Sequence, residues 1–312
     1  METATQPPRA LWVDRAKGYG IILVVVGHIA TVDRLVHDIF LFHMPLFFFL
    51  SGLTFRSFSG VAATLAKARA LLLPYVAFAL LILFCLITAN AALGSGLPVP
   101  GPFHFLLGGT FLTGAFGTFW FPTALLVTLL LLNLLLRLPL WAQGVVLAAT
   151  ATASMLLGGL TPFNPYGLLT VGMALPFAAA GHHVGLDRVA KPDWKTLAGL
   201  ALCAAAFFLL APYGGKVDFK YLDYGVFPVA PLAAAAAIAT ICLVSAIPVP
   251  GVAAIGRASL TIMYTHLLVL TLLKPAVEWP IIAVVAVAVG VALHRLFALS
   301  SPARRLLLGM RA

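Results

Sequence analysis

The sequence has little charge: only 9% of its 312 residues are Asp, Glu, Lys or Arg. Soluble globular proteins carry about 25% charged residues, so this chain lacks the polar surface that a water-soluble protein needs. Acidic residues are the scarcest, with nine against 19 basic ones. The hydrophobic fraction is 62% and the mean hydropathy is +1.08. These values exclude a soluble protein and predict an integral protein of the lipid bilayer.

Cysteine is also rare. Cys85, Cys203 and Cys242 each lie in an apolar segment, far from one another. Their spacing fits neither a disulfide framework nor a cysteine metal site, and no metal is expected. Short alternating apolar stretches, the pattern of an outer-membrane barrel, are absent as well. The apolar segments have the length of helices, so the sequence predicts an all-α fold.

Proline, glycine and charge clusters divide the chain into these apolar segments. We expect about ten transmembrane helices in a single membrane domain over residues 1–312, without a soluble extra domain. The longest connection, 94–117, is rich in Gly and Pro and predicts a short interfacial or re-entrant piece. The predicted helices are 18–34, 38–55, 70–93, 119–137, 141–159, 166–183, 196–212, 226–247, 258–274 and 278–297.

The distribution of Lys and Arg predicts the orientation. With a cytoplasmic N-terminus, ten helices place fifteen of the 19 basic residues on the cytoplasmic side. Basic residues favour that side, so both termini are predicted to be cytoplasmic, and the plasma (inner) membrane is the expected location. The net charge of +10 is thereby attributed to topology, and nucleic acid is not expected as a partner. The basic residues assigned to the outer side are Arg34, Lys216, Lys220 and Lys274.

Polar residues in the first apolar segment are the leading candidates for chemistry. An ionisable residue inside a membrane segment is costly, so it is functional by default. Lys17 and His28 are eleven positions apart, which places them within roughly 20° on one helix face and about 16 Å apart along the axis. Asp14 lies within roughly 40° of that face. The segment predicts a polar stripe with a cation at the cytoplasmic mouth and an imidazole inside the membrane.

The stripe has both a chemical and a structural interpretation. A neutral imidazole commonly removes a proton from a hydroxyl, and a cation suits a phosphate. Lys17 is equally explained as an anchor that extends to the membrane surface, and His28 as a hydrogen-bonded packing residue. His43, which opens the second segment, is either a partner of His28 or an interfacial residue.

Further candidates lie along the chain. Lys67 and Arg69, just before the third predicted helix, form either a topology signal or a phosphate-binding pair. Trp120 is either an interfacial anchor or a platform for a sugar ring. Arg257 either caps a cytoplasmic loop or binds an anion, and His266 is expected to be buried in its helix and to line the same cavity as His28.

These motifs resemble those of a known family. A basic residue, a ten-residue spacer and a histidine, here Lys17 and His28, are similar to the motif of the acyltransferase-3 family of integral membrane acyltransferases. Lys17, Gly27 and residues 43–52, HMPLFFFLSG, resemble its fucose 4-O-acetylase-like branch. Weaker similarity continues at 67–69, 119–121, 176–181 and 256–260, and leads to His266.

The resemblance implies an acyltransferase. It implies transfer of an acetyl or other short acyl group from cytoplasmic acyl-CoA to a carbohydrate hydroxyl of a surface, secreted or lipid-linked glycan. The acyl group would reach this acceptor directly or through a separate extracytoplasmic acyl-accepting protein. Acetyl-CoA, the expected acyl donor, would bind through its anionic part to a basic mouth, for which the candidates are Lys17, Lys67, Arg69 and Arg257.

The resemblance also implies roles for the remaining candidates. His28 would lie near the thioester, either as general base or as transient acyl acceptor. His43 and Asp14 are further catalytic candidates, and Trp120 and His266 are candidates for substrate binding. Two other classes stay open: a transporter or flippase with a protonatable His28 pathway, and a scaffold subunit of a glycan-export complex.

Overall fold

The computed structural model describes residues 11–186, 194–274 and 276–310. Most of these residues are helical. Within these ranges the strands are limited to β1 (Val217–Asp218) and β2 (Asp223–Tyr224), an antiparallel pair in which Val217 lies opposite Tyr224. The predicted all-α class is therefore confirmed. Four of the basic residues that entered the topology prediction lie outside the described residues: Arg9, Arg188, Lys191 and Arg311.

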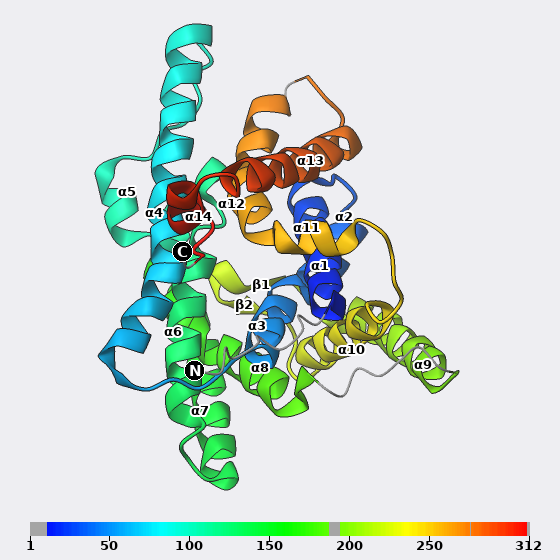
Figure 1. Cartoon of the computed structure of the whole chain (residues 1–312). Coiled ribbons are helices and arrows are strands. Elements are labelled where there is room, and N and C mark those ends of the chain that lie inside the picture. Colours follow the sequence, from blue (N-terminus) through cyan, green and yellow to red (C-terminus); the bar gives the residue numbers. More distant parts are fainter. Residues whose placement is uncertain (1–10, 187–193, 275, 311–312) are drawn as a thin grey trace, which may run out of the picture.

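Each of the ten predicted segments contains a helix (Figure 1). These helices are α1 (Leu11–Ile29), α3 (His43–Leu53), α4 (Gly60–Leu93), α6 (Trp120–Leu135), α7 (Leu140–Leu160), α8 (Val171–Val184), α9 (Trp194–Leu210), α10 (Val229–Val244), α12 (Ser259–Leu273) and α13 (Trp279–Phe297). Shorter helices connect them: α2 (Asp33–Phe40), α5 (Pro102–Leu107), α11 (Val252–Arg257) and α14 (Ser301–Leu307). The helix α5 lies in the long Gly- and Pro-rich connection, where a short piece was predicted.

Seven stretches of the described chain are long and apolar enough to cross a membrane. One of them, Asp33–Leu53, joins α2 and α3. The apolar helices α10 and α12 are shorter, and α1 has 19 residues but carries Asp14, Arg15 and Lys17. The chain is an integral membrane protein, whereas the number of ten crossings stays a prediction.

The second predicted helix, 38–55, is wrong as a single element. It is divided between α2, which ends at Phe40, and α3, which begins at His43. Pro45 has no amide hydrogen and could not continue the hydrogen bonds of a helix that came from α2. In the first turn of a new helix that missing donor costs nothing, because the first amides have no partner within the helix. The break puts His43 at the start of α3, where its side chain is buried.

The third predicted helix, 70–93, begins too late. The helix α4 starts at Gly60 and has 34 residues, because residues 62–69 are rich in Ala and contain mostly strong helix formers. Lys67 and Arg69 thus lie within α4 rather than in a loop before it. At 1.5 Å per residue, α4 is about 50 Å long, which exceeds the roughly 30 Å of a hydrocarbon core.

The helix α1 packs against α10, α11, α12 and α13. Its contact with α11 depends on glycine. A Cβ added to Gly256 would lie 1.7 Å from the carbonyl oxygen of Asp14, and one added to Gly18 would lie 2.2 Å from that of Val252. Such close backbone approach through small residues is typical of helix packing in membranes.

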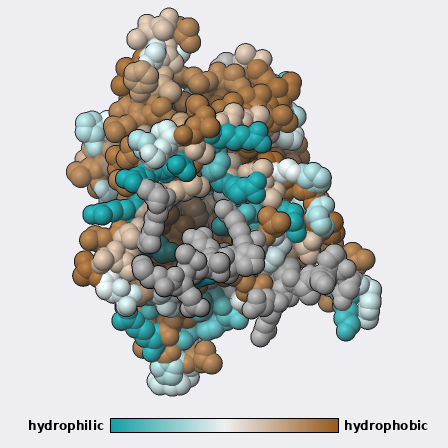
Figure 2. Space-filling view, in the orientation of Figure 1, coloured by the Kyte–Doolittle hydropathy of each residue, from teal (hydrophilic) through white to brown (hydrophobic). Residues whose placement is uncertain are grey.

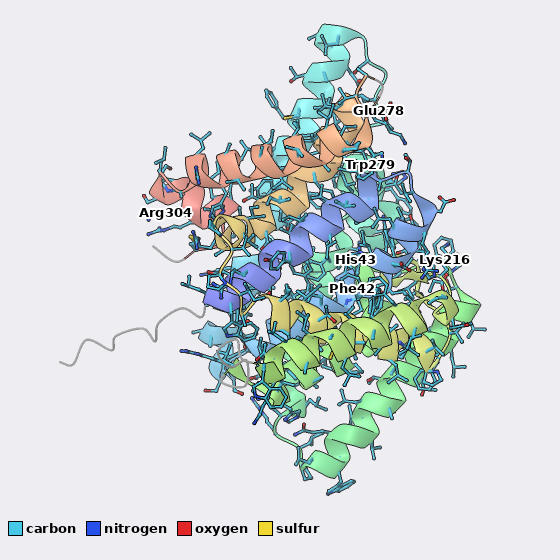
Figure 3. All side chains as sticks on the ribbon, turned by 90° about the vertical axis from the view of Figure 1, so that its right-hand side faces the viewer. Phe42, His43, Lys216, Glu278, Trp279 and Arg304 are labelled. Atoms are coloured by element: carbon cyan, nitrogen blue, oxygen red, sulfur yellow. The ribbon has the colours of Figure 1, made fainter. Side chains whose placement is uncertain are left out.

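Arg304 and Lys216, which were assigned to opposite sides of the membrane, lie at opposite edges of the molecule. In Figure 3, Arg304 lies at the left edge and Lys216 at the right, with Phe42 and His43 between them. Figure 2 shows the face that carries α14, where hydrophilic residues gather beside a hollow and hydrophobic surface covers the upper part. The orientation in the membrane, including the cytoplasmic position of the termini, stays a prediction.

Candidate active site

A cavity of about 460 Å³ lies between α1, α3, α6 and α12. Ligand sites in proteins commonly have volumes of about 300–1,000 Å³, so the cavity has the size of a binding site. Two loop segments complete its wall, 113–118 and 218–221. The lining residues that carry the chemistry discussed below are Lys17, His28, His43, Trp120, Asp218 and Lys220.

One face of α1 contributes the polar stripe. Lys17, Ile21, Val24 and His28 all line the cavity, and their spacing of four, three and four residues follows one side of an α-helix. The prediction that Lys17 and His28 share a face is therefore confirmed. The two apolar residues between them separate the cation from the imidazole.

The His28 ring is held in one tautomer. Its Nδ1 lies 2.8 Å from the carbonyl oxygen of Val24. A carbonyl oxygen can only accept a hydrogen bond, so Nδ1 carries the hydrogen and Nε2 keeps its lone pair in the neutral ring. The arrangement thus leaves one nitrogen able to take a proton.

His43 and His266 surround His28 and share its tautomer. The ring centroid of His28 is 5.8 Å from that of His43 and 5.2 Å from that of His266. The Nδ1 of His43 donates to the carbonyl of Ile39 and that of His266 to the carbonyl of Ile262, each at 3.0 Å. Three imidazoles therefore form one cluster, each with its Nε2 as the free acceptor.

The structure places the members of this cluster differently from the prediction. His43 lines the cavity, which favours a partner of His28 over an interfacial residue. His266 is buried, as predicted, but it lies against His28 and does not line the cavity wall. Its Nε2 has no hydrogen-bond partner among the described residues. The geometry does not support direct substrate binding by His266 and favours a role through His28.

Trp120 is not an interfacial anchor. It is the first residue of α6, its side chain is only 6% exposed, and it lines the cavity. An aromatic residue of the interfacial belt would face lipid and headgroups. The burial of Trp120 therefore favours the second interpretation, a flat apolar platform in the cavity wall.

The predicted basic mouth is only partly assembled. Lys17 lines the cavity, whereas Lys67, Arg69 and Arg257 do not. Lys67 lies over the Phe55 ring, with its Nζ 5.7 Å from the ring centroid, and Arg69 is exposed on α4. The helix α4 carries both residues away from the cavity wall.

Asp14 and Arg15 fix the base of α1. Asp14 is buried, and its Oδ2 is 3.9 Å from Nη1 of Arg257 on α11. Arg15 donates from Nε to the carbonyl of Ser245 at 2.6 Å, just after the end of α10. Asp14 does not line the cavity and lies fourteen residues before His28, about 21 Å along the axis. The geometry therefore favours a structural role for Asp14 over the predicted catalytic one.

Lys220 is a cavity residue that the sequence did not indicate. It lies in the one-turn helix η6 (Phe219–Tyr221), within the loop between α9 and α10, and is 7% exposed. Its Nζ donates to the carbonyl of Leu112 at 2.6 Å and lies 5.2 Å from the ring centroid of Tyr221. The alternation of apolar and charged residues from Val217 to Lys220 was the available signal for a loop that folds inward.

The electrostatics of this loop follow from burial. Burial lowers the pKa of Lys220 to about 8, and the neighbouring carboxylate of Asp218 opposes this shift. Burial also raises the pKa of Asp218, against hydrogen bonding by the Lys220 amide and the charge of its ammonium. Lys220 therefore exchanges its proton closer to neutral pH than an exposed lysine does.

Comparison with known proteins supports the chemical interpretation of the cavity. A family model described as an acyltransferase domain matches residues 10–295, a range that includes every residue of the cavity wall. Neither the curated proteins nor the solved structures give a match. The fucose 4-O-acetylase-like branch stays a prediction. With its family motif on one face of α1 and a matched range that covers most of the chain, this protein belongs to the acyltransferase-3 family and is a membrane acyltransferase.

Proposed function

We propose that this protein transfers an acetyl or other short acyl group from cytoplasmic acyl-CoA to a carbohydrate hydroxyl. The observation that carries the proposal is that Lys17 and His28 line one cavity inside the membrane domain. A cation near the basic end suits the anionic donor, and an imidazole deeper in the cavity suits activation of a hydroxyl. Family membership favours this enzyme over a transporter or flippase.

The proposed role of His28 is that of a general base. Its Nε2 would take the proton of the acceptor hydroxyl while the hydroxyl oxygen forms a bond to the thioester carbon. When the carbon–sulfur bond breaks, the departing thiolate would recover that proton, which gives the free thiol of CoA and neutral His28. Attack by Nε2 itself, with a transient acyl-histidine, uses the same lone pair. We favour the general base because the acyl transfer then needs no covalent intermediate on the enzyme.

Acetyl-CoA is the proposed donor. Its thioester and its phosphates are at opposite ends of a long molecule, so a cavity of about 460 Å³ would hold only the acyl end. Lys17, at the N-terminal end of the stripe on α1, would bind the anionic part of the donor that lies just outside the space of the acyl end. Lys67, Arg69 and Arg257 lie off the cavity wall and would bind the more distant phosphates.

The proposed acceptor is a surface, secreted or lipid-linked glycan, and the proposed location is the plasma (inner) membrane. Trp120 in the cavity wall offers a flat face for a sugar ring, as aromatic side chains do in many binding sites. A separate extracytoplasmic protein that accepts the acyl group is the alternative route to the same glycan.

The test uses purified protein in detergent with acetyl-CoA labelled in its acetyl group. Release of the CoA thiol and label on a panel of methyl glycosides are measured for the wild type, His28→Ala and His104→Ala. His104 is an exposed histidine on α5 with no place in the cavity wall. We expect the His28 variant to lose at least about a hundredfold in turnover, the scale of general-base catalysis, and the control to keep its turnover.

Equal activity of His28→Ala and the wild type would remove the role given to His28. Absence of thiol release from the wild type, with label on no acceptor, would contradict acetyl-CoA as the donor.

A further inference from the structure

A second cation lines the cavity, and it comes from the other end of the molecule. Lys220 is four residues after Lys216, which lies at the edge opposite Arg304 (Figure 3). The loop between α9 and α10 therefore turns inward from that edge. It places Lys220, a residue that is 7% exposed, in the cavity wall that also contains His28.

Buried polar groups hold this loop in place. Asn164 is fully buried, and its Nδ2 donates to the carbonyl of Lys220 at 3.1 Å and to Oγ1 of Thr170 at 2.7 Å. Thr170 in turn donates to the carbonyl of Phe219 at 2.5 Å. The hydroxyl groups of Tyr224 and Ser154 are 2.7 Å apart. These bonds hold the backbone of the loop that carries Lys220.

The ammonium of Lys220 has donors to spare. It has three N–H groups, and among the described residues Nζ donates one hydrogen bond, to the carbonyl of Leu112. Lys220 and His28 line the same cavity. A cation in the cavity of the base shares the space in which charge develops during the reaction, since the reacting hydroxyl is hydrogen-bonded to that base.

From this geometry we propose that Lys220 stabilises the oxyanion of the tetrahedral intermediate in the acyl transfer. The inference rests on the proposed function. As the acceptor oxygen bonds to the thioester carbon, the carbonyl π electrons move onto its oxygen and the hydroxyl proton passes to Nε2 of His28. The negative oxygen accepts a hydrogen bond from Nζ of Lys220. When the carbonyl re-forms, the carbon–sulfur bond breaks and the thiolate takes the proton from His28.

A fixed, buried cation is effective in this role. Donors that are already aimed at the developing charge need no reorganisation, and removal of one such donor typically lowers kcat by about 10²–10³-fold. The competing explanation is that Lys220 only joins two loops through its bond to Leu112. The two explanations differ in what they predict for kcat, for the conservative variant and for the pH profile.

The experiment compares Lys220→Met, Lys220→Arg and the control Lys216→Met, an exposed lysine of the same loop. Thiol release from acetyl-CoA is measured with methyl glycosides as acceptors, and acetyl-CoA affinity is measured by calorimetry. We expect Lys220→Met to lower kcat about a hundredfold with unchanged acetyl-CoA affinity. Lys220→Arg, which keeps the charge, should recover at least about tenfold of that loss, and Lys216→Met should match the wild type.

The pH profile of kcat, compared between the wild type and Lys220→Arg, gives a second readout. The charged form of Lys220 is the active one, so wild-type kcat should fall as the pH rises through about 8. Arginine stays charged at such pH values, so Lys220→Arg should not show this fall. The titratable groups that share the cavity wall are Lys17, His28, His43, Asp218 and Tyr221, and all five are unchanged in this comparison.

Three results would overturn the proposal while the wild type still turns over: unchanged kcat in Lys220→Met, an effect confined to KM for the glycoside, or the same alkaline fall in wild type and Lys220→Arg. Lack of any turnover in the wild type would overturn the proposed function together with this inference. If a thermal unfolding assay shows that Lys220→Met does not fold, the pH profiles of kcat for the wild type and Lys220→Arg still test the proposal.

Discussion

Lys17 and Lys220 reach the same cavity by different means. Lys17 is placed by α1 alone, because helical geometry puts it on the face of Ile21, Val24 and His28. Lys220 is placed by residues far away in the sequence, through hydrogen bonds from Asn164 and packing around a short hairpin. One position is set by local structure and the other by tertiary structure. The position of Lys17 can be predicted from a sequence pattern. The position of Lys220 can be disturbed by a substitution at a residue outside the cavity wall.

The role of Lys17 in this comparison can be tested by its replacement with methionine. If this cation binds the donor, Lys17→Met should weaken acetyl-CoA binding about ten- to a hundredfold, the scale of one charge-assisted hydrogen bond. The kcat at saturating donor should change much less. Calorimetry with acetyl-CoA and a saturation curve for thiol release measure the two effects.

Lys220→Met and His28→Ala serve as the contrast for Lys17, because both should change turnover more than donor affinity. Unchanged acetyl-CoA affinity in Lys17→Met and in Arg69→Ala would remove the basic mouth from the proposed function.

The position of Lys220 can be disturbed by a substitution at Asn164, which hydrogen-bonds to its carbonyl. Asn164→Leu removes the donor to the carbonyl of Lys220 and leaves buried acceptors unpaired, which costs about 1–3 kcal/mol. We expect a lower unfolding temperature and a fall in kcat of at least about tenfold, since an oxyanion donor must be held in place. Thermal unfolding and thiol release measure both.

A matched asparagine shows whether loss of stability alone explains that fall. Asn90 holds another loop in a similar way, with its Nδ2 2.9 Å from the carbonyl of Leu97 and its Oδ1 2.7 Å from the Leu97 amide. Asn90→Leu should lower the unfolding temperature while kcat stays near the wild-type value. A parallel fall of kcat in both variants would contradict a specific role for the Asn164 contacts.

The position of Lys17 depends on the packing of α1 against α11. Gly256→Ala would bring a methyl group to within 1.7 Å of the Asp14 carbonyl oxygen unless the helices separate. Overpacking of this kind costs about 1–3 kcal/mol, so a lower unfolding temperature is expected. We expect a smaller effect on acetyl-CoA affinity than that of Lys17→Met, because α1 moves as a unit.

Gly144→Ala is the control for Gly256, because a Cβ at this position of α7 meets no atom within 4 Å. Alanine there should be neutral or slightly stabilising. Equal unfolding temperatures for the two variants would show that α1 and α11 can separate without loss.

The sequence predicted much of this protein because membrane helices are locally encoded. Apolar length and glycine or proline boundaries located each major helix, and the spacing of Lys17 and His28 predicted their common face. The errors have physical causes. Pro45 divides a segment whose hydropathy is continuous, and Ala-rich residues extend α4 past the apolar boundary at residue 70.

The candidate site was predicted only where one helix or one motif defines it. The sequence predicted Lys220 as a basic residue on the outer side. Nothing within the loop indicates that Asn164 and Thr170 hold the loop inward. Asp14 shares a helix face with Lys17 only approximately, and the glycine contact at Gly256 decides that it faces α11 instead. Contacts between segments that are distant in the sequence determine the positions of Lys220 and Asp14. Such contacts cannot be identified from a single sequence.

The bonds from His28, His43 and His266 to their own helices also bear on proton leakage. An imidazole that relays protons across a membrane receives them on one nitrogen and releases them from the other. In each of these rings the Nδ1 is bonded to a backbone carbonyl four residues earlier, which cannot pass a proton onward. A proton taken up at Nε2 therefore leaves from the same atom. If His28 acts as the proposed general base, the cluster would therefore exchange protons with the reactants without conducting them across the membrane.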